Sequence, residues 1–287
     1  MAVRLGVVDI GSNTIRLLVA DVDGSVIVAV EQERVRLALG EEIERAGRAS
    51  ALSIAAAAKS VRRLCGIARR SDVDSLDVFV TAPGRQSANS DELVAALSTA
   101  AAHPVRILSI EEEGRLAYEG ALATVDFALP ERIAVCDVGG ASTEIAVGSP
   151  GFAPDWVGSV ELGAVRLSAR TDDLELALHE AAAAFAQLRP PPVEAALAVG
   201  GSARAARRMV GTRLGEAELM DALLDVDVTP PDAVAQKFGV GAARARILPA
   251  GVAILAQVQE LLGVPLHVCS GGLREGAVLA GARALAA

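Results

Sequence analysis

The sequence is poor in aromatic residues, cysteine and histidine, and each shortage narrows what the protein can be. Aromatic residues fill 2% of the 287 positions while 52% are hydrophobic, so the core must be built from Ala, Val, Leu and Ile, as in helices packed on sheets. Three cysteines in apolar segments favour buried thiols of a cytoplasmic protein over a disulfide framework or a zinc site. Three scattered histidines without ligand spacing indicate neither a histidine-based metal site nor a Ser/His/Asp triad.

Charge and hydropathy argue against two broad classes of partner. The net charge of −9 disfavours sequence-independent binding to nucleic acids or membrane surfaces. No apolar run approaches the ~18 residues of a membrane span, and the first residues enter a strand without a leader, so we expect no export. Because Lys59 and Lys237 are the only lysines, contacts to phosphate would have to come from arginine side chains and backbone amides.

The order of apolar segments predicts two α/β halves. Three strand-like runs open the chain, the second and third joined at Asp23-Gly24, and helices then alternate with strands in the order βββαβαβα. From residue 132 the strand pattern begins again, so the second half repeats the first with extra helices. Such a repeat predicts two sheets with helices on their faces, facing each other across a cleft.

Two glycine-containing turns occupy equivalent places in the two halves. Aligning Asp137 with Asp9 places DVGGASTE on DIGSNTIR, with apolar strands on both sides of each copy. Successive backbone N–H groups in such turns suit phosphate oxygens, and the aspartates beside them are candidate Mg²⁺ ligands. A tight hairpin explains either turn alone, whereas two equivalent copies favour phosphate binding. The candidate phosphate-binding residues are Gly11, Ser12, Asn13, Thr14, Gly139, Gly140, Ala141, Ser142 and Thr143.

The segment EEEGR at 111–115 begins a predicted helix. Acidic residues in a first turn complement the helix dipole, which is sufficient to explain Glu111 and Glu112. The three carboxylates fan out over roughly 200°, so at most one or two can face the cleft. A carboxylate facing a phosphate suits the orientation or deprotonation of an attacking water.

Together, DIGSNTIRLL, SIEEEGRLAYEG, DVGGASTE and SGGLREG resemble the exopolyphosphatase/guanosine pentaphosphate phosphohydrolase (Ppx/GppA) family of the actin, sugar-kinase and heat-shock-chaperone superfamily. The resemblance implies an α/β fold of two ribonuclease-H-like (actin-like ATPase) domains related by internal duplication, with the active site in the interdomain cleft. We expect the first domain at 1–124, with a C-terminal helix at 275–287 packing back on it, and the second at 125–274.

The resemblance also implies roles for single residues. Glu113 takes the place of the catalytic glutamate, and Glu144 that of a second important acid, although pairing with an arginine explains Glu144 equally well. The segment TAPGRQSAN places the phosphate-binding arginine at Arg85 and a family asparagine at Asn89, and Arg85 stands where a helix N-terminus would also attract an anion. Arg115 is expected to pair with the glutamates.

The sequence departs from the family pattern at three points. Ala141 replaces a glycine, which predicts a tighter or shifted turn because alanine disfavours positive φ. Pro83-Gly84 replaces Ala-Leu and predicts a changed local backbone before the phosphate-binding arginine. The helical extension of longer members does not follow the second domain, so processive action on long chains is not expected.

The expected function is release of terminal phosphate from inorganic polyphosphate, including short chains, with Mg²⁺ (Mn²⁺ as an alternative) bound by Asp9 and Asp137. Guanosine pentaphosphate is the alternative substrate. A non-catalytic sensor of guanosine tetra- or pentaphosphate and an ATP-dependent kinase are the competing hypotheses. We expect no nucleic-acid or membrane partner, and the chain is a candidate homodimer.

Overall fold

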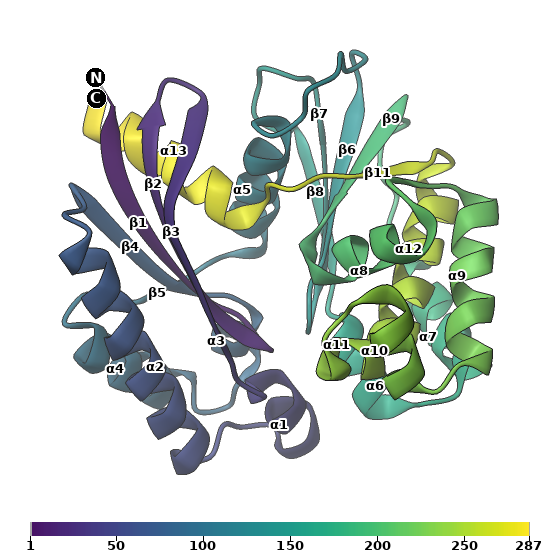
Figure 1. The fold of residues 1–287 in the computed structure, drawn as a ribbon, viewed down its shortest axis with the longest axis horizontal. Coiled ribbons are helices and arrows are strands. Elements are labelled where there is room, and N and C mark those ends of the chain that lie inside the picture. Colours follow the sequence, from purple (N-terminus) through teal and green to yellow (C-terminus); the bar gives the residue numbers. More distant parts are fainter. Residues whose placement is uncertain (1, 287) are drawn as a thin grey trace. The chain divides into compact units, whose positions relative to one another are not determined.

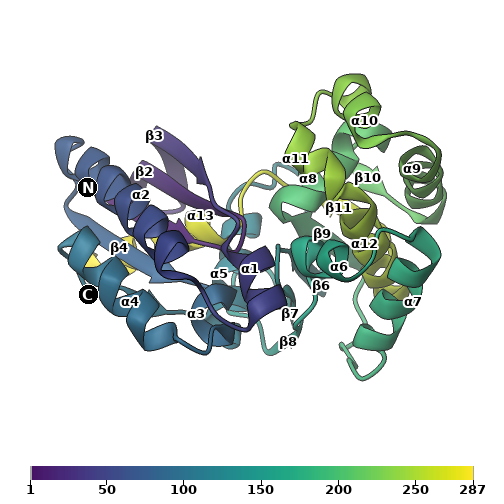
Figure 2. The same ribbon diagram turned by 90° about the horizontal axis from the view of Figure 1, so that it is seen from below.

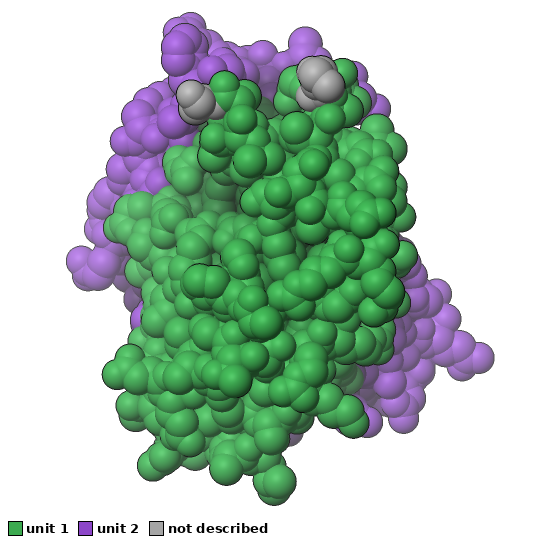
Figure 3. Space-filling view, turned by 90° about the vertical axis from the view of Figure 1, so that its left-hand side faces the viewer, with its two compact units in different colours: residues 1–123, 273–287 green, residues 124–272 purple. Residues whose placement is uncertain are grey.

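Two mixed β-sheets organise the chain, and each belongs to its own unit (Figure 1). The computed structural model describes residues 2–286. Contacts group residues 1–123 and 273–287 into unit 1 and residues 124–272 into unit 2, which Figure 3 colours separately.

The sheet of unit 1 has the strand order β3-β2-β1-β4-β5. The first three strands pair antiparallel, and β4 and β5 add parallel to β1. The predicted hairpin is present, with a two-residue turn in which Gly24 takes a φ of 60°. The strands are β1 (Val3–Ile10), β2 (Thr14–Asp23), β3 (Val26–Arg36), β4 (Ser75–Val80) and β5 (Arg106–Ile107).

Helices cover both faces of this sheet, and alternate residues of β1 pack on opposite sides. Val8 packs with Leu64 and the helices α2 and α4, which lie side by side in Figure 2. Val7 packs on the other face with Leu116 of α5 and Val278 of α13. The helices of unit 1 are α1 (Leu39–Ala46), α2 (Ala51–Arg70), α3 (Ala82–Gln86), α4 (Ser90–Ala101), α5 (Ile110–Leu122) and α13 (Leu273–Ala286).

Unit 2 repeats this five-strand topology and adds one strand. Its order is β10-β11-β9-β6-β7-β8, with β6, β7 and β8 antiparallel and β9 and β11 added parallel to β6. Cys136 and Ala198 of the sheet pack against Phe185, Leu219 and Leu255 from three helices. The strands are β6 (Ile133–Val138), β7 (Thr143–Gly148), β8 (Trp156–Val160), β9 (Ala195–Val199), β10 (Arg213–Leu214) and β11 (Leu266–Val268). The helices are α6 (Ala164–Arg170), α7 (Leu174–Phe185), α8 (Gly200–Val210), α9 (Glu216–Val228), α10 (Pro231–Phe238), α11 (Ala242–Arg246) and α12 (Leu248–Leu262).

The expected α/β fold class is confirmed, with local differences. The pattern of residues 87–101 predicts one helix; the structure begins α4 at Ser90 and places the separate short helix α3 before it, at Ala82–Gln86. The apolar run at 105–109 predicts a strand, of which β5 forms two residues. The cysteines are free and buried, as expected, and burial raises the pKa of the Cys269 thiol to about 11. Among residues 2–286, no helix is both long enough and apolar enough to cross a membrane. A shared cleft and an origin by duplication stay predictions.

Candidate functional site

In the turn between β1 and β2, the carbonyl groups accept hydrogen bonds from backbone N–H groups of unit 1. Gly11 N–H donates to the Thr14 carbonyl at 3.0 Å and closes the turn. The Ser12 carbonyl accepts from Gly40 N–H at 2.8 Å, and the Asn13 carbonyl accepts another backbone hydrogen bond at 2.9 Å. Within the part of the chain that the structure describes, the N–H groups of Ser12 and Asn13 donate no hydrogen bond. The turn therefore keeps adjacent donors of the kind that bind phosphate oxygens.

The turn between β6 and β7 has the same construction. Gly139 N–H donates to the Ser142 carbonyl at 3.1 Å, which is the equivalent closing bond. The carbonyls of Gly139 and Gly140 accept at 2.8–3.0 Å from the first three N–H groups of α6. Across residues 2–286, the N–H groups of Gly140, Ala141 and Ser142 have no acceptor. Both turns thus leave donors where the sequence predicted phosphate binding.

The structure removes the reason for expecting a tighter or shifted turn at Ala141. Positive φ angles among the non-glycine residues of 2–286 occur only at Asp72 and Ala102, so Ala141 takes an ordinary conformation, and it is 4% exposed. Glycine is required instead at Gly139, where a Cβ would lie 2.9 Å from the Ser142 carbonyl oxygen. The methyl group of Ala141 therefore adds no backbone strain to this turn.

Two hydroxyl groups among the candidate phosphate-binding residues have hydrogen-bond partners in their own unit. Thr143 is fully buried, and its hydroxyl donates to the Leu162 carbonyl at 2.7 Å. The Thr14 hydroxyl accepts from Arg16 Nε at 3.2 Å. The Thr143 hydroxyl thus holds the segment after β8.

The aspartates at the strand ends have different cross-strand neighbours. Asp9 lies opposite Arg16, whereas Asp137 lies opposite Glu144. Glu144 is 2% exposed and accepts a hydrogen bond from Ser159 Oγ at 3.1 Å. The sequence did not single out Ser159, because only the pairing of β7 with β8 brings it to Glu144.

The three glutamates at the start of α5 divide as the helix geometry predicts. Glu112 and Ser109 form a capping box, and Glu112 also pairs with Arg106 at 2.8 Å. The pKa of Glu111 is lowered, first by a hydrogen bond from its own N–H and then by the Ser109 hydroxyl. Only Glu113 is buried, at 7% exposure. Glu111 and Glu112 therefore belong to the helix N-terminus, and Glu113 is the candidate for chemistry.

Arg85 lies directly against Glu113. Its Nη1 donates to Glu113 Oε2 at 2.7 Å and to the Leu108 carbonyl at 2.9 Å. Asn89, three residues after α3, instead exchanges hydrogen bonds with the backbone of Ala49 at 3.0 Å, so its amide links the start of α4 to the segment before α2. The family segment at 81–89 thus combines one residue at the candidate site with one that supports the fold.

The family segment SGGLREG, at residues 270–276, allows α13 to pack closely on α5. A Cβ on Gly276 would overlap the Leu116 carbonyl oxygen, so only glycine allows α13 to approach α5 this closely. Arg115 pairs with Glu119, four residues further along α5, at 3.0 Å, and not with the three glutamates as expected. Arg283 of α13 also contacts Glu119.

The glycines after β9 serve close packing in the same way. Gly200 has a φ of 91°, and a Cβ there would lie 2.5 Å from Asp137 Oδ1. At Gly201 a Cβ would collide with the Arg244 guanidinium. The segment AVGGSARAARR is therefore a strand-to-helix turn that brings the start of α8 against the Asp137 carboxylate.

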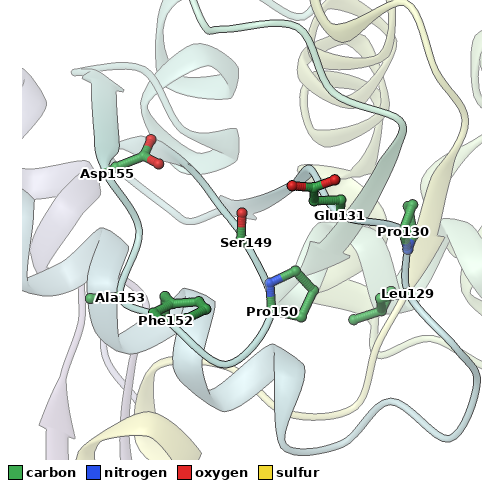
Figure 4. A pocket seen from close by; sticks show the side chains of 8 residues that line it. All are labelled: Leu129, Pro130, Glu131, Ser149, Pro150, Phe152, Ala153 and Asp155. Carbon is green, nitrogen blue, oxygen red and sulfur yellow. The ribbon is translucent and has the colours of Figure 1, made fainter.

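A pocket of about 450 Å³ lies at the other end of β6 and β7 (Figure 4). It lies between the segment that precedes β6 and the turn that follows β7, so it contains none of the predicted site residues. Asp155 on its wall pairs with Arg132, which holds the pKa of that carboxyl below its usual range. Its lining residues are Leu129, Pro130, Glu131, Ser149, Pro150, Phe152, Ala153 and Asp155.

These features define a class of protein: an α/β fold with two actin-like ATPase-type sheets and, after the first strand of each, a turn whose backbone N–H groups are not all hydrogen-bonded. The model of the Ppx/GppA phosphatase family matches residues 18–227, which is well over half of the chain. The chain therefore belongs to the Ppx/GppA phosphatase family, and the resemblance found in its motifs is confirmed.

Two curated relatives align with much of the chain. An uncharacterized protein of Streptomyces coelicolor is 32% identical over 165 residues, covering 58% of this chain and 48% of its own length. The guanosine-5'-triphosphate,3'-diphosphate pyrophosphatase of Vibrio cholerae is 29% identical over 303 residues, covering 94% of this chain and 58% of that protein. The chain spans about half the length of these curated relatives.

Two solved structures share the fold along nearly the whole chain. The PPX-GPPA enzyme of Aquifex aeolicus has a TM-score of 0.80 at 21% identity, covering 98% of this chain and 100% of that one. An exopolyphosphatase from Cytophaga hutchinsonii has a TM-score of 0.81 at 19% identity, covering 97% and 98%. At these identities the likeness shows the fold.

Proposed function

We propose that this chain is a phosphohydrolase that releases the terminal phosphate of inorganic polyphosphate, including short chains. The observation that carries the proposal is the single buried carboxylate of Glu113 at the start of α5. A buried glutamate beside a phosphate is suited to orient and deprotonate an attacking water. Membership of the Ppx/GppA phosphatase family supports this role.

The two turns would hold the phosphates of the chain. Two N–H groups of the first turn and three of the second have no acceptor among the described residues, whereas carbonyls of both turns accept hydrogen bonds from neighbouring segments. Donors fixed in this way need no rearrangement when an anion binds, so they stabilise charge in the transition state as well as in the substrate. That both turns bind one substrate stays a prediction of the family resemblance.

In the proposed reaction, the oxygen of a water molecule bonds to the terminal phosphorus while the bond from phosphorus to the bridging oxygen breaks. Glu113 accepts the proton of the water, and the bridging oxygen leaves with the shortened chain. The products are orthophosphate and a polyphosphate one unit shorter. Most of the catalysis is positioning and charge neutralisation, because phosphoryl transfer needs little covalent chemistry from the protein.

A divalent cation fits the donor chemistry beside the turns. Mg²⁺ prefers oxygen ligands and keeps several waters, so one or two carboxylates are sufficient on the protein side. Asp9 and Asp137 would each offer one, and Glu144 lies opposite Asp137 in the sheet. Among residues 2–286, no three or more His, Cys, Asp or Glu are grouped so that they could hold a metal ion by themselves, so substrate and waters would complete the coordination. When bound, Mg²⁺ or Mn²⁺ would offset phosphate charge.

Guanosine pentaphosphate is the second candidate substrate. The Vibrio cholerae relative, whose name refers to this nucleotide, aligns with 94% of the chain. The sensor hypothesis loses one of its supports, because Ala141 has no strained backbone. The kinase hypothesis would require transfer to an acceptor other than water.

The test compares phosphate release by the purified protein, with Mg²⁺ or Mn²⁺, from short polyphosphate, long polyphosphate and guanosine pentaphosphate. We expect the highest kcat/KM on short polyphosphate. Preference for the nucleotide would replace the first substrate by the second. Tight binding of guanosine tetra- or pentaphosphate without phosphate release from any substrate would establish the sensor, and ATP-dependent labelling of a small acceptor would establish the kinase.

A further inference from the structure

One nitrogen of the Arg85 guanidinium is shared by two acceptors within unit 1. Nη1 donates to Glu113 Oε2 at 2.7 Å and to the Leu108 carbonyl at 2.9 Å. The side chains of Arg85 and Glu113 are 15% and 9% exposed, so water replaces little of this interaction. A charge-assisted hydrogen bond of this length fixes both distance and direction. The guanidinium therefore restrains the same carboxylate that the reaction needs.

The local backbone explains why Arg85 reaches this position. Gly84 packs against the sheet, where a Cβ would lie 2.6 Å from Val80 Cγ1 and 3.2 Å from Ile107 Cγ1. Its N–H donates to the Thr81 carbonyl at 2.9 Å. The Pro83-Gly84 departure thus lets α3 lie directly on the ends of β4 and β5. That close approach brings Arg85 to the carbonyl that immediately precedes the N-cap of α5.

We propose that Arg85 is a positioning residue, which holds the Glu113 carboxylate in the orientation required for deprotonating the attacking water. The inference rests on the proposed function. The resemblance assigned Arg85 to phosphate, but its Nη1 is engaged with the two acceptors of its own unit. Because a misplacement of about 1 Å can cost roughly 100-fold in rate, a fixed carboxylate matters for turnover more than for affinity.

The two roles of Arg85 predict different kinetics. A phosphate clamp binds substrate, so its loss raises KM and adds to the effect of losing Glu113. A positioning residue acts through Glu113, so its loss lowers kcat at nearly constant KM and adds nothing once Glu113 is replaced. A double-mutant cycle therefore distinguishes them.

The experiment measures kcat and KM for phosphate release from short polyphosphate in wild type, Arg85→Ala, Arg85→Lys, Glu113→Gln and the Arg85→Ala/Glu113→Gln double variant. We expect Arg85→Ala to lower kcat about 30-fold with KM within about threefold, and Arg85→Lys to recover part of the loss. The double variant should match Glu113→Gln alone. Arg106→Ala is the matched control, because the exposed Arg106 pairs with Glu112 and Asp77 and not with Glu113, and the turnover of this variant should stay near wild type.

If the two losses of kcat multiply in the double variant, or if Arg85→Ala raises KM tenfold at unchanged kcat, the inference is overturned. Arg85 would then bind the phosphate directly. If Arg85→Ala does not fold, Gly84→Ala tests the same geometry, since it displaces α3 and keeps the guanidinium. Its kcat should fall without a matching change in KM, and an unchanged kcat would count against the inference. An inactive wild type on every substrate would instead overturn the proposed function itself, so the two failures are distinguishable.

Discussion

Beside each turn, three residues are paired across neighbouring strands of the sheet, and the net charge of these three residues is opposite in the two units. In unit 1 the paired residues are Arg34, Arg16 and Asp9, and in unit 2 they are Ser159, Glu144 and Asp137. Side chains paired across strands share one face of a sheet, so each set of three is a local charge cluster. Two arginines suit a phosphate, whereas two carboxylates suit a cation. One topology therefore offers two chemistries, because the fold sets the positions and the side chains set the charge.

The units also differ in how their sheets are covered. Unit 2 builds its hydrophobic core from one continuous stretch of chain. Unit 1 covers one face of its sheet with α13, which follows all of unit 2 in the sequence. Unit 1 therefore depends on a late, non-local contact for the face that also packs against α5, the helix that carries Glu113.

The largest expected effect distinguishes the role of Glu113 in unit 1 from that of Glu144 in unit 2. Glu113→Gln should lower turnover by about 100-fold or more while substrate binding is retained, because the amide cannot accept the proton. Glu144→Gln should chiefly raise the Mg²⁺ concentration needed for activity. Steady-state kinetics at varied Mg²⁺ measure both, with Glu112→Gln as the outward-facing control. Near-wild-type turnover of Glu113→Gln would disprove its assigned role.

The next effect tests the contact in unit 1 between α5 and α13, the last helix of the sequence. Gly276→Ala should lower the free energy of unfolding by about 2 kcal/mol, because the methyl group would overlap the Leu116 carbonyl. Gly281→Ala on the same helix is the control, since its Cβ would make ordinary contacts with Leu5 at 3.5 Å. Urea unfolding measures the difference. Equal stability of the two variants would mean that α13 does not approach α5 as described.

A smaller effect compares glycine positions within the unit 2 turn. Gly139→Ala should weaken phosphate-dependent activity about tenfold, because its Cβ would lie 2.9 Å from the Ser142 carbonyl and shift the donors. Ala141→Gly, which restores the family residue, should change activity little, since Ala141 is unstrained. Activity at saturating and limiting polyphosphate checks both. A large gain from Ala141→Gly would show that the alanine impairs the turn.

The smallest effect concerns the ion pair between Arg132 and Asp155, beside the pocket of unit 2. Arg132 holds the pKa of Asp155 below its usual value near 3.8, so this ion pair stabilises the fold above that value. The contribution should disappear as pH falls through the lowered pKa. Asp155→Asn should therefore reduce Tm slightly at pH 6 and by less at pH 2.5. An equal difference at both pH values would attribute the change to packing instead.

Local patterns in the sequence predicted much of the fold. The run of β1 is apolar on both faces, which predicts a strand between two helical layers. Ser50 or Ser53 could cap the helix that begins there, and the structure shows Ser50 as the N-cap of α2; Asp23-Gly24 leads into the predicted hairpin. The spacing of the three glutamates limited how many could face inward, and burial selects Glu113. Roles for the site residues stay predictions.

The sequence by itself determined the two α/β halves, the paired turns and the family, because periodicity, caps and motifs are properties of neighbouring residues. Only the tertiary structure decided that Arg85 contacts Glu113, that Ser159 contacts Glu144, and that Ala141 is unstrained. Arg85 and Glu113 are 28 residues apart, and their contact depends on how closely α3 packs on two strands. Such distances arise from the packing of whole elements, which no local pattern encodes.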